Sequence, residues 1–294
     1  MRLKKIYTFD IVNTFLLAFI GFCTFYPLYN MYVYAFNDGL DAMQGILYFW
    51  PRKFTLDNFR IAFENEGIVD AFLVSVARTL SGTFLTLLCT SSLAYAMTKR
   101  KMPGYKIFSM FFFITFLFSG GIVPYFLTIR MLGLYDTFWI MIIPGIYSYW
   151  YMILFRSFFD SIPESIEESV KIDGGSYANV YIYMIIPLSK PVFAAIALFQ
   201  AVGHWNDWFT GIFYIKTQSL VPLQSLLQKV MLEMSAIQAL MKMSGGNLAN
   251  TLFNITPNAI RLAIAVITVT PIICVYPFLQ KYFIKGIMLG AIKG

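Results

Sequence analysis

The sequence predicts an all-α membrane protein with six transmembrane helices and both termini in the cytoplasm. Of its 294 residues, 59% are hydrophobic and only 13% are charged, whereas soluble domains keep about a quarter of their residues charged. The mean hydropathy is +0.67. Six apolar segments reach the roughly 20 residues that a helix needs to cross a bilayer. Because lipid cannot satisfy backbone hydrogen bonds, each segment is expected to be helical.

The six predicted spans form a single transmembrane domain over residues 1–294 and cover residues 11–36, 71–98, 107–128, 138–159, 191–215 and 258–283. The first follows a basic start, Met1-Arg2-Leu3-Lys4-Lys5, as a signal peptide would. Its apolar stretch is too long for a signal peptide and has no clean cleavage site, so we expect a retained helix. Glycine and proline predict kinks in the third span, at Phe118-Ser119-Gly120-Gly121 with Pro124, and in the fourth, at Pro144-Gly145.

Basic residues set the predicted orientation. Lys99, Arg100, Lys101 and Lys106 crowd the short loop between the second and third spans, and further lysines lie near both ends of the chain. Short cytoplasmic loops carry this excess of positive charge, which also explains the net charge of +7 without nucleic acid. The termini, the 99–106 loop and residues 160–190 are therefore predicted inside, and residues 37–70, 129–137 and 216–257 outside.

The two long outer loops have different predicted structures. Residues 37–70 contain Pro51 and mixed charge, which indicates a compact extracellular cap. Residues 216–257 contain an apolar run at helical spacing, formed by Leu223, Leu226, Leu227, Val230, Met231 and Met234. This helix is expected to lie on the outer membrane surface or to plug the mouth of a pore, and to end at Gly245-Gly246-Asn247. The three cysteines (Cys23, Cys89 and Cys274) lie in apolar runs and indicate neither disulfides nor a metal site.

Residues 160–190 form a polar, carboxylate-rich insert between two apolar segments. Ser161 is a candidate cap for a helix with Pro163 and Glu164 in its first turn, running to Asp173. Two glycines then predict a left-handed stop, and Ser176 a second helix to Ile186 that breaks at Pro187. On the first helix Glu167 and Lys171 are spaced to pair. On the second, an apolar stripe would be exposed unless a partner covered it, and consists of Tyr177, Val180, Tyr181 and Met184.

This insert resembles the EAA loop of the permeases of ATP-binding-cassette (ABC) importers. Glu168-Ser169-Val170, then Gly174, then Ile186-Pro187 follow its pattern, with Ser169-Val170 in place of two alanines and Ile186 in place of leucine. Three other stretches are similar to sugar-importer permeases: Phe54-Thr55-Leu56-Asp57-Asn58-Phe59, Trp205-Asn206-Asp207 and the tail from Gln280 to Gly294. The chain most resembles the carbohydrate-uptake branch that includes the maltose transporter's smaller permease, and within it the LplC/YtcP-like group for complex oligosaccharides.

The resemblance implies a type I ABC importer permease in the bacterial cytoplasmic membrane. A second, different permease would complete the pore, and two copies of a separate ATPase would bind beneath, holding ATP and Mg²⁺; this chain would hold no cofactor itself. An extracellular solute-binding protein would deliver a carbohydrate. The residues implied in coupling to the ATPase are Glu164, Glu168, Asp173, Gly174, Gly175, Tyr177, Tyr181 and Pro187. The tail from Lys281 to Gly294 would insert near the ATPase dimer.

The fifth predicted span carries a polar face, because Gln200, His204 and Asp207 recur at helical spacing with tryptophans beside them. Ionisable groups within the bilayer are costly and usually face a cavity. Two interpretations stay open: the face lines a sugar path, or Asp207 and Asn206 tie the span to its neighbours. The candidate path residues are Gln200, His204, Trp205, Asn206, Asp207 and Trp208. Arg78 would pair with Asp207 or, in the interpretation that we favour, extend to the outer interface.

The sequence favours a non-enzymatic protein. It has no G-x-x-x-x-G-K-[ST] phosphate loop, and its single histidine, His204, has no acidic or cysteine cluster at metal-ligand spacing. The alternatives are a secondary transporter or channel that works without an ATPase, and an ABC permease for a non-sugar solute. A secondary transporter usually shows interrupted helices in corresponding halves, and we find no such symmetry in the sequence.

Overall fold

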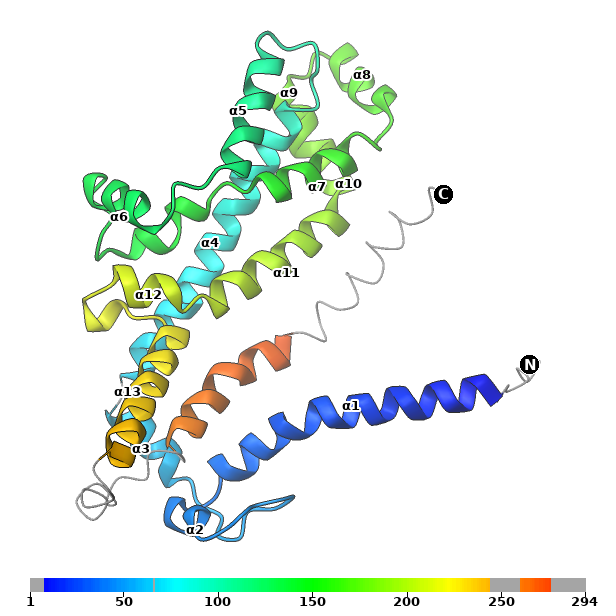
Figure 1. Cartoon of the computed structure of the whole chain (residues 1–294). Helices are drawn as coiled ribbons and strands as arrows, with labels where there is room; N and C mark the ends of the chain where they lie inside the picture. The colour runs from blue at the N-terminus through cyan, green and yellow to red at the C-terminus, as the bar shows by residue number, and fades with distance from the viewer. Residues whose placement is uncertain (1–7, 66, 244–259, 276–294) are drawn as a thin grey trace. The chain divides into compact units, whose positions relative to one another are not determined.

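The computed structural model describes residues 8–65, 67–243 and 260–275, and in these ranges it contains helices joined by short connections and no strand of a sheet (Figure 1). The chain divides into two compact units. The first comprises the described residues up to Ile68 and those between Lys229 and Thr270. The second comprises Val69–Gln228 and the described residues from Pro271 onward.

The first unit contains α1 (Thr8–Ala35), α2 (Gly39–Met43) and α3 (Asp57–Asn65), with parts of α13 (Leu223–Met243) and of the helix Ile260–Val275. The apolar surface of α1 is mostly exposed, as a helix surrounded by lipid would have it. Its last turn packs through Ala35 on Ala263 and Val266. This packing fixes the end of α1 against the helix Ile260–Val275.

Within the predicted extracellular cap of residues 37–70, the segment 36–58 packs compactly on the end of α1, and its extracellular position stays a prediction. Asn58 donates hydrogen bonds from Nδ2 to the carbonyls of Ala35 (2.9 Å) and Asn37 (2.8 Å), which ties the start of α3 to the end of α1. The Phe36 ring lies between Phe54 and Phe59, with centroids 5.7 and 4.8 Å away. The Phe54-to-Phe59 stretch therefore has a structural role, because its asparagine and both phenylalanines close the turn after α1.

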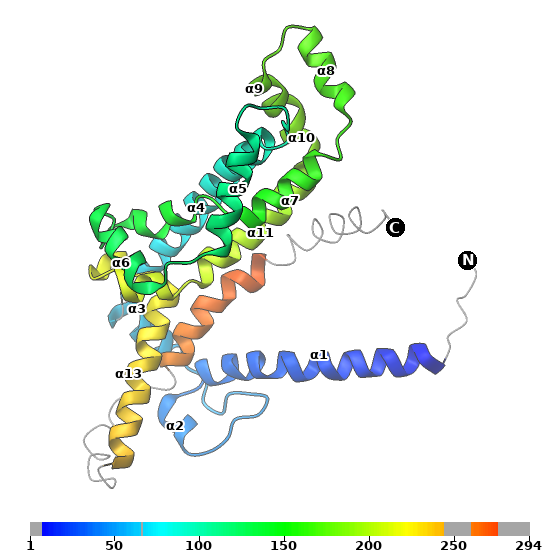
Figure 2. The same cartoon turned by 45° about the horizontal axis from the view of Figure 1, so that its top comes forward.

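The second unit contains the site and is organised along α4 (Ile68–Ala96), the long helix drawn in cyan in Figure 1. Its other helices are α5 (Tyr105–Leu117), α6 (Ile122–Met131), the 3₁₀ turns η1 (Phe138–Met141) and η2 (Ile143–Gly145), α7 (Tyr149–Phe159), α8 (Glu164–Ile172), α9 (Tyr177–Val180), the π-helix η3 (Tyr181–Ile185), α10 (Ile186–Leu188), α11 (Lys190–Asn206), α12 (Phe209–Tyr214) and the 3₁₀ turn η4 (Gln218–Leu220). In the views of Figures 1 and 2, α8 and α9 lie beyond one end of α4, and α6 lies far from them.

Only α1 and α4, among the described helices, are single helices long and apolar enough to cross a membrane. Three further candidates are bent pairs, which brings the total to five if each pair is one span. The turns at η1–η2 and α7 meet at 47°, and α5 and α6 at 119°. The predicted kinks at Pro144-Gly145 and at 118–121 are confirmed, but the second is too sharp for 107–128 to be one continuous helix. Gly121, with φ +81°, supplies the left-handed backbone at that turn.

The fifth predicted span, 191–215, also ends early. Helix α11 begins at Lys190 with Pro191 in its first turn, as expected, but stops at Asn206, and α12 is a separate short helix. Asp207 causes the break, because its Oδ1 accepts a hydrogen bond from the Thr210 backbone N–H at 3.1 Å and starts a new turn. The helix Ile260–Val275 lies within the sixth predicted span, whose remaining residues are outside the described ranges.

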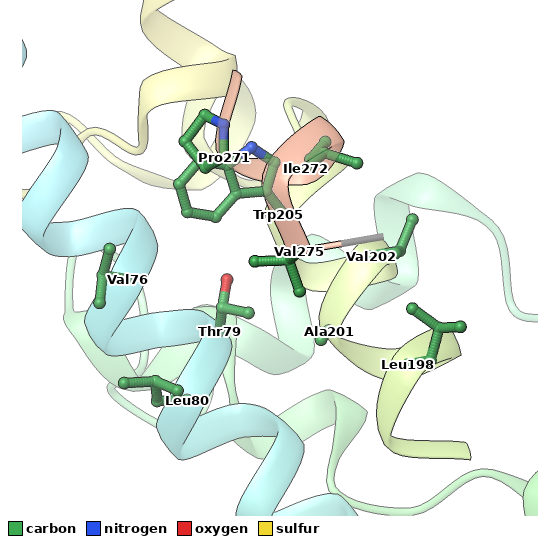
Figure 3. A pocket seen from close by; sticks show the side chains of 10 residues that line it. All are labelled: Val76, Thr79, Leu80, Leu198, Ala201, Val202, Trp205, Pro271, Ile272 and Val275. Carbon is green, nitrogen blue, oxygen red and sulfur yellow. The ribbon is translucent and has the colours of Figure 1, made fainter. Parts of the chain in front are cut away.

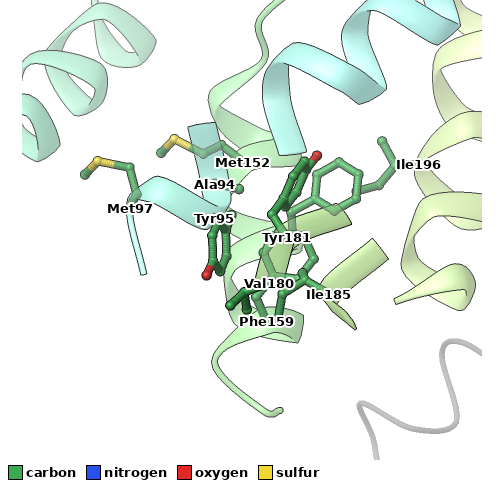
Figure 4. Packing of buried hydrophobic residues seen from close by; sticks show 10 residues of the cluster. Ala94, Tyr95, Met97, Met152, Phe159, Val180, Tyr181, Ile185 and Ile196 are labelled. Atoms are coloured by element: carbon green, nitrogen blue, oxygen red, sulfur yellow. The ribbon is translucent and has the colours of Figure 1, made fainter. Parts of the chain in front are cut away.

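A hydrophobic cluster joins α4 to α7 and to the segments that follow α7 (Figure 4). Its fully buried members include Phe155 on α7 and Val180 on α9. The complete cluster of buried residues is Ala94, Tyr95, Met97, Met152, Phe155, Phe159, Val180, Tyr181, Ile185 and Ile196. Burying each large side chain contributes about 1.5–3 kcal/mol, so this cluster holds the polar insert in a defined position at the end of α4.

Candidate functional site

The polar face predicted on the fifth span exists and points at α4. Gln200 donates a hydrogen bond from Nε2 to Thr86 Oγ1 (3.2 Å), and its Nε2 lies 2.9 Å from His204 Nε2. The His204 ring packs directly on Gly82, where an added Cβ would lie 2.7 Å from Cε1. Any larger side chain at position 82 would therefore displace the imidazole. These contacts fix the rotation of α11 against α4.

Arg78 and Asp207 form an ion pair between α4 and the end of α11. The Arg78 side chain is 3% exposed and that of Asp207 is 27% exposed. Arg78 also donates from Nη1 to the backbone carbonyl of Asp207 at 3.1 Å. The favoured interpretation, in which Arg78 extends to the outer interface, is wrong, since a carboxylate lies within reach and the guanidinium is buried beside it. Asp207 thus ties the fifth span to its neighbour, as one of the two interpretations required.

The aromatic residues beside this face separate into different environments. Trp205 is buried and lines an apolar cavity of about 240 Å³ between α4, α11 and the end of the helix Ile260–Val275 (Figure 3). Apart from Thr79, whose hydroxyl points toward this space in Figure 3, the side chains around it are apolar. Asn206 and Trp208 are exposed. The six predicted path residues therefore do not converge on one cavity, and their role in binding sugar stays a prediction.

The predicted glycine elbow is present in the insert. At the end of α8, Gly174 has φ +80°, and the N–H groups of Gly174 and Gly175 donate to the carbonyls of Lys171 (3.0 Å) and Val170 (2.8 Å). This is the pairing of a Schellman motif. Ser176 then caps α9, accepting a hydrogen bond from Asn179 N–H at 3.3 Å. The elbow is consequently a defined turn between two helices.

Two local expectations for the insert differ from the structure. Ser161 does not cap α8, because its hydroxyl donates back to the Phe158 carbonyl at 2.6 Å and the helix begins at Glu164. The second helix does not end at Pro187: it widens into the π-helix Tyr181–Ile185 and bends by 80° where α11 begins at Lys190. Proline lacks an N–H and clashes with the preceding turn, and a π segment before it accommodates the ring.

The chain itself covers the middle of the stripe predicted on the second helix. Val180 and Tyr181 are buried in the cluster of Figure 4, where the Tyr181 ring stacks on Tyr95 with centroids 5.4 Å apart. The Tyr181 hydroxyl lies 2.6 Å from Ser91 Oγ on α4. The expectation that the stripe needs a partner to cover it is therefore wrong for Val180 and Tyr181, whereas Tyr177 stays 55% exposed. Tyr181 connects the insert to α4 instead.

The outer surface of the insert carries exposed side chains, both charged and apolar. Glu164, Glu168 and Asp173 are exposed there. Between them, Ile172 is 85% exposed, and Tyr177 is 55% exposed. A protruding apolar side chain surrounded by carboxylates is typical of a surface that a protein partner covers. This surface, comprising Glu164, Glu168, Ile172, Asp173 and Tyr177, is called the elbow surface below.

The inner side of α8 carries a cluster of ion pairs, of which the sequence predicted only the Glu167–Lys171 pair. Lys99, in the turn that follows α4, forms an ion pair with Glu167, which also accepts a hydrogen bond from Lys171 at 2.7 Å. Burial tends to raise the pKa of Glu167, but the hydrogen bonds from Lys171 and Lys99 outweigh it and lower that pKa. A polar cavity of about 190 Å³ lies beside this pair, under α8. Only the spacing of Glu167 and Lys171 was visible in the sequence; the partnership with Lys99 joins residues 68 positions apart.

Comparison with known proteins agrees with this geometry. The family model described as "Binding-protein-dependent transport system inner membrane component" matches residues 62–289. Protein LplC of Bacillus subtilis (strain 168) is 36% identical over 287 residues, covering 97% of this chain and 95% of LplC. The polygalacturonan/rhamnogalacturonan transport system permease protein YtcP of the same strain is 34% identical over 284 residues, covering 97% of each chain.

A solved structure is similar over nearly the whole length. It is described as the crystal structure of a bacterial ABC transporter involved in the import of the acidic polysaccharide alginate. One of its chains matches with a TM-score of 0.82 and 26% sequence identity, covering 96% of this chain and 99% of that chain.

Proposed function

The chain belongs to the family of binding-protein-dependent transport system inner membrane components, and from this premise we propose that it carries an oligosaccharide into the cell as one permease of an ATP-driven importer. It is a transport component and not an enzyme. A second, different permease completes the translocation pore in this proposal. Two copies of a separate ATPase bind ATP and Mg²⁺, and an extracellular solute-binding protein delivers the sugar.

One observation supports the coupling role most directly: the elbow surface protrudes from an otherwise apolar chain and is fixed in shape. The Schellman turn at Gly174 holds α8 and α9 at a set angle, and the buried cluster anchors them to α4. A rigid projection can transmit a displacement, whereas a flexible loop would absorb it. The elbow surface is the part of the chain that the ATPase grips, and its carboxylates and Ile172 are the contacts.

The sugar assignment is supported by the relatives. YtcP is described as a permease for polygalacturonan or rhamnogalacturonan, and the similar crystal structure as an importer of alginate. We propose an oligosaccharide as the substrate of this chain on that basis. The cavity beside Trp205 is not the expected place for it, because its apolar lining offers few partners to sugar hydroxyls.

We also propose the six-span topology with cytoplasmic termini in the bacterial cytoplasmic membrane. The spans are α1, α4, α5 with its sharp turn into α6, the η1–η2 turns with α7, α11, and the helix containing Ile260–Val275. The basic loop at Lys99 and the insert then lie on the same, cytoplasmic side. Labelling of an Ile172→Cys variant with a membrane-impermeant thiol reagent tests this: reaction in inverted vesicles only supports it, and reaction in intact cells contradicts it.

The decisive experiment for function is Glu168→Ala, with Glu64→Ala on α3 as the matched control in another exposed helix. The expected result for Glu168→Ala is weaker co-purification of the ATPase and reduced uptake of labelled oligosaccharides, tested with oligogalacturonides and a neutral panel. Glu64→Ala should leave both unchanged. Transport by the purified chain without any ATPase or second permease would refute the proposal and favour a self-sufficient transporter.

A further inference from the structure

Lys99 joins the end of α4 to the inner side of α8. Its ammonium group pairs with Glu167, and the two side chains are 28% and 13% exposed. The second oxygen of Glu167 lies 2.7 Å from Lys171 Nζ, one turn further along α8. A carboxylate that is largely shielded from water and shared by two lysines holds them more firmly than an exposed pair does.

Two tyrosine rings complete this arrangement. Lys99 Nζ lies 4.6 Å from the ring centroid of Tyr95 on α4, and Lys171 Nζ lies 4.2 Å from that of Tyr177 on α9. Lys99 is also 5.7 Å from the Tyr177 ring. Both distances to the nearer rings are within the range of cation–π attraction. Lys99, Glu167, Lys171, Tyr95 and Tyr177 thus connect α4, α8 and α9, and they are called the Lys99 clasp below.

The same helix α4 is joined to α11 farther along its length. Arg78 pairs with Asp207, and Thr86 accepts from Gln200. Between these contacts and the clasp, Ser91 contacts the Tyr181 hydroxyl. Since α4 is one uninterrupted helix from Ile68 to Ala96, it forms a continuous rod with the insert attached at one end and α11 along its side.

We propose that Lys99 is a positioning residue that makes α8 and α4 move as one body, so that a displacement of the elbow surface reaches α11 through α4. The displacement itself rests on the proposed function, in which the ATPase supplies it. Glu167 precedes the Glu168-to-Gly174 motif, and Lys99 lies in a different loop, so neither belongs to the residues that the family resemblance assigned to coupling.

The test measures the distance between spin labels at Ser165→Cys on α8 and Phe84→Cys on α4, two exposed positions outside the elbow surface. The three native cysteines are replaced by serine, and the complete importer is compared without nucleotide and with ATP trapped by vanadate. The parent protein, in which the Lys99 clasp is intact, should give the same narrow distribution of label distances with and without trapped ATP. Lys99→Gln should broaden the distribution and make it depend on nucleotide, whereas Lys99→Arg should preserve it.

Lys101→Gln is the matched control, since Lys101 is exposed in the same loop and has no ion pair among the described residues; it should behave like the parent. Exchanging the charges, Lys99→Glu with Glu167→Lys, should restore the narrow distribution. An unchanged distribution in Lys99→Gln, or no restoration by the exchange, overturns the proposal. Failure of the parent chain to co-purify with an ATPase counts against the proposed function instead, and the label distances in the full chain still decide whether the clasp holds.

Discussion

Arg78→Met removes the buried cation between α4 and α11 and leaves Asp207 without its charged partner. Arg78 is 3% exposed and donates both to the carboxylate and to the Asp207 carbonyl at 3.1 Å. Removing one partner of a buried ion pair costs about 3–5 kcal/mol. Asp207 keeps two hydrogen bonds from Thr210, at 3.1 and 2.6 Å, and is 27% exposed, so the lower end, about 3 kcal/mol, applies here.

In a chain of this size, about 1 kcal/mol corresponds to roughly 2 °C in melting temperature, so Arg78→Met should melt about 6 °C below the parent in detergent. Arg60→Met is the control, because the Arg60–Glu64 pair is 73% and 57% exposed and such pairs contribute at most about 1 kcal/mol. Combining Arg78→Met with Asp207→Asn should cost little more than Arg78→Met alone, since the carboxylate left unpaired is then neutral. A melting temperature within about 1 °C of the parent, or fully additive losses in the double variant, would refute the reasoning.

Three further predictions concern the same unit. Gly82→Ala should lower the melting temperature by a few degrees, because overpacking costs about 1–3 kcal/mol and the new methyl group would lie against His204; an unchanged melting curve would contradict this. Because the pKa of Glu167 is lowered in the folded protein, its ion pairs stabilise the fold above its ordinary pKa of 4.5 and are lost as the pH falls through the lower pKa of the folded state. Melting temperatures measured from pH 7 to 3 should show this loss of stability in the parent and not in Glu167→Gln. Gly174→Val should strain the left-handed turn by about 1–2 kcal/mol and weaken co-purification of the ATPase. Gly203→Val, in open space on α11, should leave co-purification unchanged. If both variants retained the same amount of ATPase, the role of the turn would be contradicted.

Much of the insert could be predicted because its signals are local. The two glycines after Asp173 predicted the left-handed turn, and Ser176 predicted the cap of α9; both are confirmed. The pairing of Glu167 with Lys171 follows from helical spacing and is also confirmed at 2.7 Å. Each of these depends on residues within about one helical turn of one another, where backbone geometry alone fixes the distance.

Whether each span is one continuous helix was harder to predict, because hydropathy carries no information on where the helix axis bends. Residues 107–128 are apolar throughout, yet the backbone at Gly121 turns α6 by 119° from α5. Residues 191–215 are apolar outside one polar face, yet Asp207 ends α11, since its side chain starts a new turn and its backbone carbonyl accepts a hydrogen bond from Arg78. Apolar length predicts that a segment enters the membrane and leaves its path undetermined.

The sequence by itself determined that this is a helical membrane protein with a polar insert that contains a glycine turn, because composition, apolar length and local turn chemistry are properties of neighbouring residues. Only the tertiary structure decided which surface of the insert is exposed to solvent, since the burial of Val180 and Tyr181 depends on α4, about 90 positions earlier. It likewise paired Arg78 with Asp207 and Lys99 with Glu167. Such pairings depend on how helices pack, and side chains far apart in the chain become neighbours only when the fold buries them together.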